Sequence, residues 1–318
     1  MSLSSPFVVS LFGLILGVTF SIRSAAGDSA TTEVADSTQG CVLCFYQPDN
    51  MAFDAQNNIY LVDTDHKHRS RILKLTPEGQ VLADWRVFTD GPGTNNGPNG
   101  IAIDNGGNIY VPDGGAQQML KLSPMGKIIA TFGKASSTVK DDYWHVAVDP
   151  TGNVYVVEFG RNLIQEFTSD GKLAAKWHRE HGLGSDQWRN PQTIAIGKND
   201  TLVVDDWGND RIEVLSRTGE NKLIFRGAGA MNEGLISSSG ACTDSAGNIY
   251  VADYQRNRIK EYDFRGHLFN TIKDDRKPRL FEHAPFSIAC GRDGNLYSAD
   301  GLSVIKYTKD GVLLARWR

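Results

Sequence analysis

The sequence predicts an all-β protein, a β-propeller of six blades with four antiparallel strands in each blade. One short pattern carries this prediction: a polar residue, then alternating apolar residues, then an acid. Its successive copies begin 45 to 50 residues apart. The copies are Asn58–Asp63, Asn108–Asp113, Asn153–Glu158, Asp200–Asp205, Asn248–Asp253 and Asn295–Asp300. Repeats of about 40 to 50 residues with strand-like content are typical of propellers, so one repeat is expected to form one blade.

Each repeat divides into four short strands, and the second repeat shows them clearly. Gly100–Asp104 and Ile109–Asp113 alternate apolar residues, the period of a strand. The intervening turn contains Gly106 and Gly107, which supply a positive φ without a Cβ clash. A third strand is expected at Gln118–Ser123 and a fourth at Ile128–Phe132.

Residue size recurs by position and predicts how the blades pack. The first strand carries a small residue in every repeat: Ala52, Ala102, Ala147, Ala195, Cys242 and Ala289. The fourth strand carries a large aromatic residue in five repeats: Trp85, Phe132, Trp177, Phe225 and Trp317, with Ile272 in the remaining one. Small residues suit the crowded axis, and large residues suit the wider outer gap between blades. We expect the ring to close without strand exchange, with Val42–Tyr46 as an optional edge strand.

The N-terminal segment predicts export. Phe7–Ile22 is a nearly unbroken apolar run, and Ser24, Ala25 and Ala26 offer a cleavage site for a signal peptidase. The expected domains are a signal peptide over residues 1–26, a flexible lead-in over 27–46 and the propeller over 47–318. The protein is then secreted or periplasmic, with no membrane contact after cleavage. An uncleaved anchor stays open as an alternative, because residues 1–6 carry no Lys or Arg.

The charge balance argues against one class of partner. The formal net charge is −4, which gives no positive patch for nucleic acid.

Four cysteines in an exported chain raise the question of disulfides. Cys41 and Cys44 form a Cys-x-x-Cys pair ahead of the propeller, where a local disulfide or an attachment role is expected. Cys242 and Cys290 lie on the inner strands of adjacent blades, offset by one position, so their side chains point to opposite faces of their own sheets, and opposite faces of adjacent blades can face each other. A disulfide or two buried thiols are both compatible with this placement.

The repeat motif resembles the NHL repeat. The resemblance rests on Pro-x-Gly-Ile-Ala-x-Asp, Gly-Asn-Ile-Tyr-Val-x-Asp and Asn-x-Arg-Ile, clearest at Pro98–Asp113 and Gly247–Ile259 and weakest in the fourth repeat. It implies a six-bladed propeller, and in sensor and adaptor proteins of this family the propeller acts as a binding scaffold.

Strand direction predicts two rings of residues on one face, here called the top face. The residues before the inner strands are Asp49, Asn99, Trp144, Gln192, Ser239 and Phe286. The acids that end the second strands are Asp63, Asp113, Glu158, Asp205, Asp253 and Asp300. Six acids around an axis could hold a calcium ion. The favoured interpretation is local: each acid accepts backbone N–H bonds from the loop that follows it.

The repeat also resembles, more distantly, that of the peptidyl-α-hydroxyglycine α-amidating lyase, which binds zinc. That enzyme places its zinc-binding histidines before inner strands, where this sequence has Asn99, Gln192 and Phe286. His145 follows the expected histidine position by one residue. Arg69 and Tyr254 could be offered for the Arg and Tyr of the lyase, but no motif supports either assignment. Two further histidine pairs, His66 with His68 and His178 with His181, are expected to be exposed loop residues.

The sequence therefore favours a binding scaffold for a protein, peptide or glycan and not an enzyme, with no cofactor and no catalytic residue assigned. The expected ligand-binding residues on the top face are Asp49, Asn99, Trp144, Gln192, Trp207, Ser239, Tyr254 and Phe286. The alternative is a zinc- or calcium-dependent lyase or a lactonase-type hydrolase.

Overall fold

The structure is a computed structural model. It describes residues 45–64, 70–88, 98–114, 116–133, 143–226, 234–235, 237–273, 281 and 283–318. All of them belong to one compact unit of the chain. Residues 1–44 lie outside the described part. They include the predicted signal peptide, Cys41 and Cys44. No helix in the described part is long and apolar enough to cross a bilayer.

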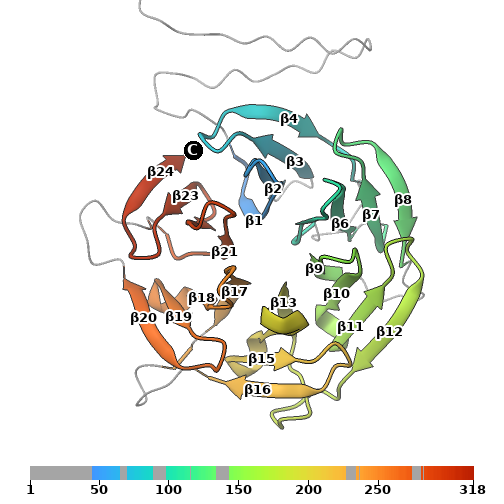
Figure 1. Cartoon of the computed structure of the whole chain (residues 1–318), viewed down its shortest axis with the longest axis vertical. Helices are drawn as coiled ribbons and strands as arrows, with labels where there is room; N and C mark the ends of the chain where they lie inside the picture. The colour runs from blue at the N-terminus through green and yellow to red at the C-terminus, as the bar shows by residue number, and fades with distance from the viewer. Residues whose placement is uncertain are drawn as a thin grey trace, which may run out of the picture. The chain divides into compact units, whose positions relative to one another are not determined.

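Six sheets of four consecutive antiparallel strands form a ring, which confirms the predicted fold (Figure 1). The first blade comprises β1 (Pro48–Phe53), β2 (Ile59–Thr64), β3 (Ser70–Leu75) and β4 (Val81–Trp85). The second comprises β5 (Ala102–Ile103), β6 (Ile109–Asp113), β7 (Gln118–Leu122) and β8 (Ile128–Phe132). The third comprises β9 (Tyr143–Val148), β10 (Val154–Glu158), β11 (Leu163–Phe167) and β12 (Leu173–His178).

The chain continues around the ring in the same way. The fourth blade comprises β13 (Pro191–Ile196), β14 (Leu202–Asp206), β15 (Arg211–Leu215) and β16 (Asn221–Phe225). The fifth comprises β17 (Ser238–Thr243), β18 (Ile249–Asp253), β19 (Arg258–Tyr262) and β20 (Leu268–Lys273). The sixth comprises β21 (Ser287–Cys290), β22 (Leu296–Ala299), β23 (Val304–Tyr307) and β24 (Leu313–Trp317). Short 3₁₀ turns are η2 (Phe159–Arg161), η3 (Lys198–Asp200), η4 (Trp207–Asn209) and η5 (Tyr254–Arg256).

The ring closes through side chains, since every sheet is built from consecutive strands. Trp317, near the end of the chain, donates its indole N–H to the carbonyl of Glu78 in the first blade at 2.8 Å. The Ser287 hydroxyl donates to the carbonyl of Asp49 at 2.8 Å. Of the optional edge strand Val42–Tyr46, only Phe45 and Tyr46 are described, and neither is in a strand.

Outer-strand aromatic residues link five of the six pairs of neighbouring blades. Five glycines at positive φ in the outer turns lie against an aromatic ring of the preceding blade, where a Cβ would overlap the ring or press on it. The pairs are Gly126 with Trp85, Gly171 with Phe132, Gly219 with Trp177, Gly266 with Phe225 and Gly79 with Trp317. The predicted packing of these aromatic residues between blades is therefore confirmed.

Replacing Gly126 with Ala should destabilise the ring more than the same change at Gly294. Both glycines have a similar positive φ, +76° and +80°, so both variants bear the backbone strain of about 1–2 kcal/mol. Only at Gly126 does the new methyl group also meet an indole, because nothing lies within 4 Å of a Cβ at Gly294. The extra cost should be about 1–3 kcal/mol in urea unfolding. Equal losses in the two variants would contradict the packing role.

A disulfide joins Cys242 to Cys290, with the two Cα atoms 5.7 Å apart. It connects β17 to β21, so it fastens the fifth blade to the sixth beside the axis. Of the two states that the sequence left open, the structure has the bonded one.

The register of the fourth blade corrects the sequence alignment by one residue. The backbone N–H of Gly197 donates to the carbonyl of Thr201 at 2.7 Å, as that of Asp149 donates to Asn153 in the third blade. Thr201, and not Asp200, is therefore the counterpart of Asn153. The acid that ends the second strand is Asp206, and Asp205 lies one position earlier.

Candidate functional site

The top face is built by the starts of the inner strands and the ends of the second strands. Pro48 pairs with Asp63, Pro191 with Asp206, and Ser238 with Asp253. In these three blades a bulge follows the pair, and it inserts Asp49, Gln192 and Ser239 at the inner edge of the face. Three of the six residues predicted at the starts of the inner strands are thus placed by an irregularity in strand pairing that recurs in these blades.

Four partly exposed aromatic residues, Phe159, Trp207, Tyr254 and Phe286, form an arc on the top face over blades three to six. The first three begin η2, η4 and η5, directly after a second strand ends. The rings of Phe159 and Trp207 lie 5.9 Å apart, and those of Tyr254 and Phe286 lie 5.8 Å apart in an edge-to-face arrangement. Trp207 is 38% exposed and Tyr254 is 39% exposed. The aromatic arc therefore offers apolar surface for stacking.

Sequence analysis missed Phe159, although a local signal was present. In three blades an aromatic residue is followed three positions later by Asn or Asp with a positive φ: Asn162, Asp210 and Asn257. Asn and Asp tolerate this left-handed conformation better than other non-glycine residues, so they end the short 3₁₀ turn. The turn then places the aromatic residue at the same point of each blade.

An ordered connection between the third and fourth blades supports Trp207. The backbone N–H of Arg189 donates to Asp206 at 2.7 Å, and the N–H of Gly208 donates to the carbonyl of Arg189 at 2.8 Å. The fully buried indole of Trp188 donates to Glu213 at 3.0 Å. This connection is an irregular loop that fixes the turn bearing Trp207.

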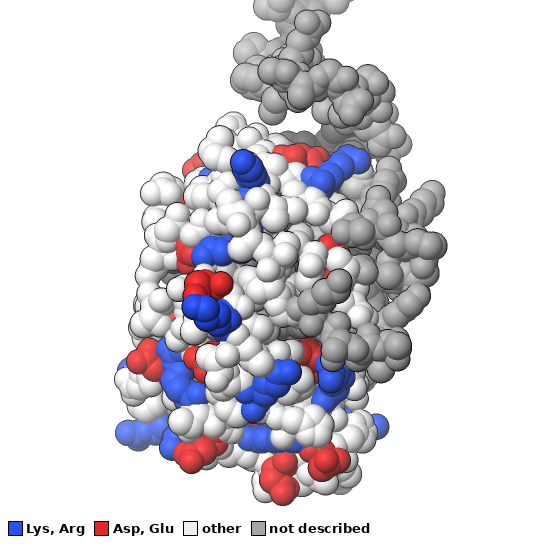
Figure 2. Space-filling model, turned by 90° about the vertical axis from the view of Figure 1, so that its right-hand side faces the viewer, with Lys and Arg blue, Asp and Glu red and all other residues white. Residues whose placement is uncertain are grey.

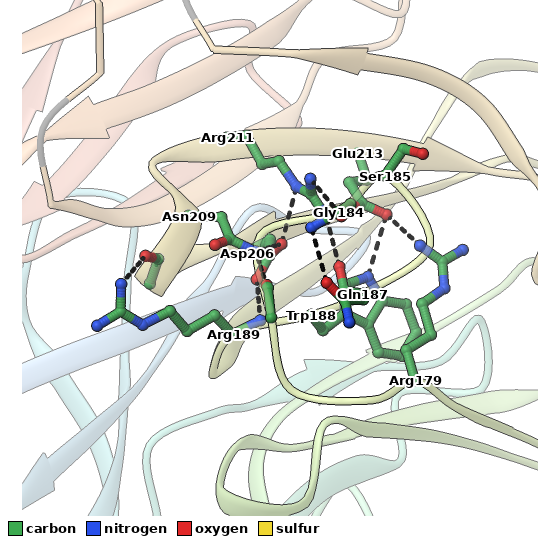
Figure 3. Close-up of polar contacts among 12 residues, drawn as sticks. Arg179, Gly184, Ser185, Gln187, Trp188, Arg189, Asp206, Asn209, Arg211 and Glu213 are labelled. Carbon is green, nitrogen blue, oxygen red and sulfur yellow. Dashed lines mark hydrogen bonds and ion pairs between the residues drawn. The ribbon is translucent and has the colours of Figure 1, made fainter.

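Arg211 also holds that loop in place. Its guanidinium contacts Asp206 at 2.8 Å and Glu213 at 2.5 Å, and donates to the carbonyl of Gly184 at 2.9 Å (Figure 3). The side chain is 2% exposed, and both acids are fully buried. Such a network fixes geometry as long as every charge keeps its partner.

Polar side chains connect the inner strands of the first four blades. Asn50 donates to the carbonyl of Asn99, and its side-chain oxygen lies 3.3 Å from Nε2 of His145. The backbone N–H of Ile194 donates to Nδ1 of His145 at 3.4 Å, which assigns the ring proton to Nε2. Burial lowers the pKa of His145 to about 4, so the imidazole is neutral at pH 7. Both ring nitrogens are engaged, which leaves neither available as a metal ligand in this arrangement.

Asp49 is the acid among the six residues that precede the inner strands. Burial raises the pKa of its carboxyl to about 7, because removal from water disfavours the charged form. Near neutral pH the side chain is therefore close to half ionised. Asn50 donates to Asp49 at 3.2 Å.

The acids at the ends of the second strands have partners of two kinds. Asp113 and Asp300 accept backbone N–H bonds from the loops that follow them, as predicted. Asp63 and Asp253 pair with Arg71 and Arg258, each in the next strand of its blade, and Asp206 pairs with Arg211 in the same way. Glu158 accepts from Arg161 at 3.0 Å and from Gln165. Asp205 is not a member of this ring, which corrects the sequence prediction.

Several predicted residues lie elsewhere or outside the described part. The side chain of Trp144 is not described, nor are His66, His68 and Arg69. His178 and His181 are exposed, as expected, although His178 is the last residue of β12 and not a loop residue. Within the described ranges, no group of three or more His, Cys, Asp and Glu side chains is placed to hold a metal ion.

Comparisons with known proteins support the fold and leave the activity open. No family model and no curated protein matches the chain. A streptogramin B lyase structure is 15% identical, with a TM-score of 0.62 over 87% of this chain and 84% of that one. The fold is that of a six-bladed β-propeller.

Other similar propellers differ widely in function. A gluconolactonase from Xanthomonas campestris is 15% identical, with a TM-score of 0.59 over 81% of this chain and 84% of that one. A chain of the nidogen/laminin complex is 19% identical, with a TM-score of 0.56 over 72% of this chain and 81% of that one. Two of these propellers are enzymes and one belongs to a binding complex. Likeness at this level of identity shows the fold alone, so function must be argued from the site.

Proposed function

We propose that this chain is a secreted or periplasmic NHL-type propeller that binds a protein, peptide or glycan on its top face. The aromatic arc is the observation that carries this proposal. Three of its rings occupy equivalent positions in successive blades, and a buried ionic network holds one of the three turns in place. Rigid, partly exposed aromatic residues provide contact area at a low cost in conformational entropy.

The chemistry beside the arc suits a polar ligand with an apolar face. The Gln192 amide and the Asp49 carboxyl lie at the inner edge, where the bulges place them, whereas the buried Ser239 hydroxyl donates to the carbonyl of Pro285 at 2.8 Å. A few polar groups within an aromatic surface fix a ligand's orientation and supply specificity. Figure 2 shows Lys and Arg interspersed with Asp and Glu on the side it presents, so that side has no positive patch of the kind nucleic acid requires.

Binding should depend on Trp207 and Tyr254. We expect the double variant Trp207→Ala/Tyr254→Ala to bind at least about tenfold more weakly, since central aromatic residues dominate many interfaces. Its free energy of unfolding should fall by less than about 2 kcal/mol, because both side chains are partly exposed. The experiment screens the full chain against a glycan array and a displayed-peptide library, then measures the affinity of each hit.

The matched control is Phe269→Ala, because Phe269 is an exposed aromatic residue on outer strand β20. Hits that survive the double variant and vanish with Phe269→Ala would place the binding surface elsewhere.

A second proposal, a lyase or lactonase-type hydrolase, has one supporting observation. A carboxyl whose pKa is about 7 can take or give a proton near neutral pH, and Asp49 has that pKa at the inner edge of the top face. Lactone turnover by the purified chain, with and without added zinc or calcium, tests it. Turnover that Asp49→Asn abolishes would favour the enzyme over the scaffold.

A further inference from the structure

The bulge in the fourth blade sets Gln192 and Thr193, two residues with side-chain oxygens, opposite Asp205. Pro191 pairs with Asp206, and the next pair along the strands is Thr193 with Asp205. One residue of β14 therefore stands opposite two residues of β13, Gln192 and Thr193. Bulges of this kind redirect side chains and are over-represented beside active sites.

An acid is unusual at the strand position that Asp205 occupies. The equivalent residue of the second strand is apolar in the other five blades: Val62, Pro112, Val157, Ala252 and Ala299. Asp205 is nevertheless fully buried. Burying a carboxyl among apolar groups is costly unless it is paired, and breaks of this kind in a local pattern are expected at functional sites.

The three side chains share a second property, because each has a buried oxygen without a hydrogen-bond partner. These atoms are Oδ2 of Asp205, Oγ1 of Thr193 and Oε1 of Gln192. Thr193 is 2% exposed, so its hydroxyl cannot turn to solvent. The other carboxyl oxygen of Asp205 accepts from the Ser238 hydroxyl at 2.5 Å. Unpartnered buried polar atoms are rare in native proteins and call for an explanation such as a bound water or ion.

The surroundings of the Asp205 carboxyl disfavour its ionised form. Burial raises the pKa of the Asp205 carboxyl well above its usual range, and the nearby charges of Asp206 and Asp210 raise it further. The Ser238 hydroxyl opposes this shift by donating to the ionised form. A cation on the free oxygen would stabilise the ionised carboxyl in the same way.

We propose that Gln192, Thr193 and Asp205 form a binding site for a hard cation, for which calcium is the probe. A carboxylate, a hydroxyl and an amide carbonyl are the oxygen ligands that such ions prefer, and water commonly completes their coordination. The site contains one acid and two neutral groups, so it differs from the six-acid ring that the sequence suggested. It does not rest on the proposed scaffold function, and either can fail alone.

The test uses the full chain after treatment with chelator and dialysis. Calcium should raise the midpoint of thermal unfolding by a few degrees at about 100 times its Kd, since a ligand of the folded state stabilises it by mass action. Titration calorimetry should show one bound ion. Asp205→Asn keeps the shape and the acceptor for Ser238 while removing the charge, and it should weaken binding at least about tenfold.

Two further variants make the outcome decisive. Asp310→Asn removes an exposed acid and should respond to calcium as the unmodified protein does. Thr193→Val replaces the hydroxyl at nearly constant shape and should also weaken binding, which keeps the proposal testable if Asp205→Asn fails to fold. A response to sodium that Asp205→Asn removes would support the site with sodium as its ion. No response to calcium, sodium or magnesium, or a response that persists in both Asp205→Asn and Thr193→Val, would overturn it.

Discussion

Replacing Arg211 with Met is expected to lower the free energy of unfolding by about 3–5 kcal/mol. Arg211 is 2% exposed and is shared by two fully buried acids, Asp206 and Glu213. Methionine fills much of the same volume but leaves the buried Asp206 carboxylate without its guanidinium partner, while Glu213 keeps its pair with Arg179. The loop that carries Trp188 and supports Trp207 should loosen as well, because Arg211 also donates to the carbonyls of Gly184 and Gln187. Urea unfolding, together with the fluorescence of the buried indole, measures both effects.

Two other cations provide a graded control. Arg258 occupies the same position in the fifth blade and pairs with Asp253, but it is 14% exposed, so Arg258→Met should cost less. Lys172 is 81% exposed beside Asp170, and Lys172→Met should change stability by no more than about 0.5 kcal/mol. Adding Asp206→Asn to Arg211→Met should recover part of the loss, because it removes the buried charge whose guanidinium partner is gone, whereas Glu213 still pairs with Arg179 at 2.7 Å. A loss for Arg211→Met no larger than that for Lys172→Met would show that the network contributes little.

Removing the disulfide should have an effect of similar size. The bond between Cys242 and Cys290 closes a loop across 48 residues of sequence. Loop-closure entropy for that length gives a stabilisation of about 4 kcal/mol, through its restriction of the unfolded chain. The double variant Cys242→Ala/Cys290→Val should therefore unfold at a markedly lower urea concentration.

The other blades supply the replacement residues for this test. Ala occupies the position of Cys242 in the five other blades, and Val148 occupies that of Cys290 in the third blade. Packing should thus change little, and the loss should report mainly the bond. The unmodified protein under reducing conditions should approach the stability of the variant. If both forms unfold alike without reductant, and the thiols are free to alkylation, the bond does not form in solution.

The supported loop suggests how the proposed scaffold gains affinity. Trp207 lies on a turn whose backbone is hydrogen-bonded to Arg189 and whose neighbour Asp206 is paired with Arg211. A side chain ordered before binding loses little entropy when the ligand arrives. The buried ionic network, although distant from any ligand, would then act on affinity through Trp207.

Periodicity determined most of the fold. Glycine and aspartate in the turns end each strand, and the spacing of the repeats sets the number of blades, because each sheet is assembled from neighbours in the chain. The small residues at the axis and the aromatic residues at the rim follow from the same repeat. The offset of Cys242 and Cys290 also placed them face to face, but whether they are bonded could not be read from spacing.

The fourth blade shows where sequence reasoning reached its limit. Two adjacent acids, Asp205 and Asp206, fit the end of the pattern equally well, and the usual Asn before the strand is replaced by Thr201. The hydrogen bonds of the turn decide the register, and a shift of one residue moves a side chain to the opposite face of a strand. That shift separates the acid paired with Arg211 from the buried acid of the proposed cation site.

The sequence by itself thus determined the blade, its repetition and the face on which the connections meet, because these depend on local pattern and on the alternation of strands. Only the tertiary structure decided which groups lie together: the aromatic arc across blades three to six, the loop fixed by Arg211, and the three unpartnered oxygens at the bulge. These depend on contacts between blades and on strand register, which arise when residues distant in the chain pack against one another.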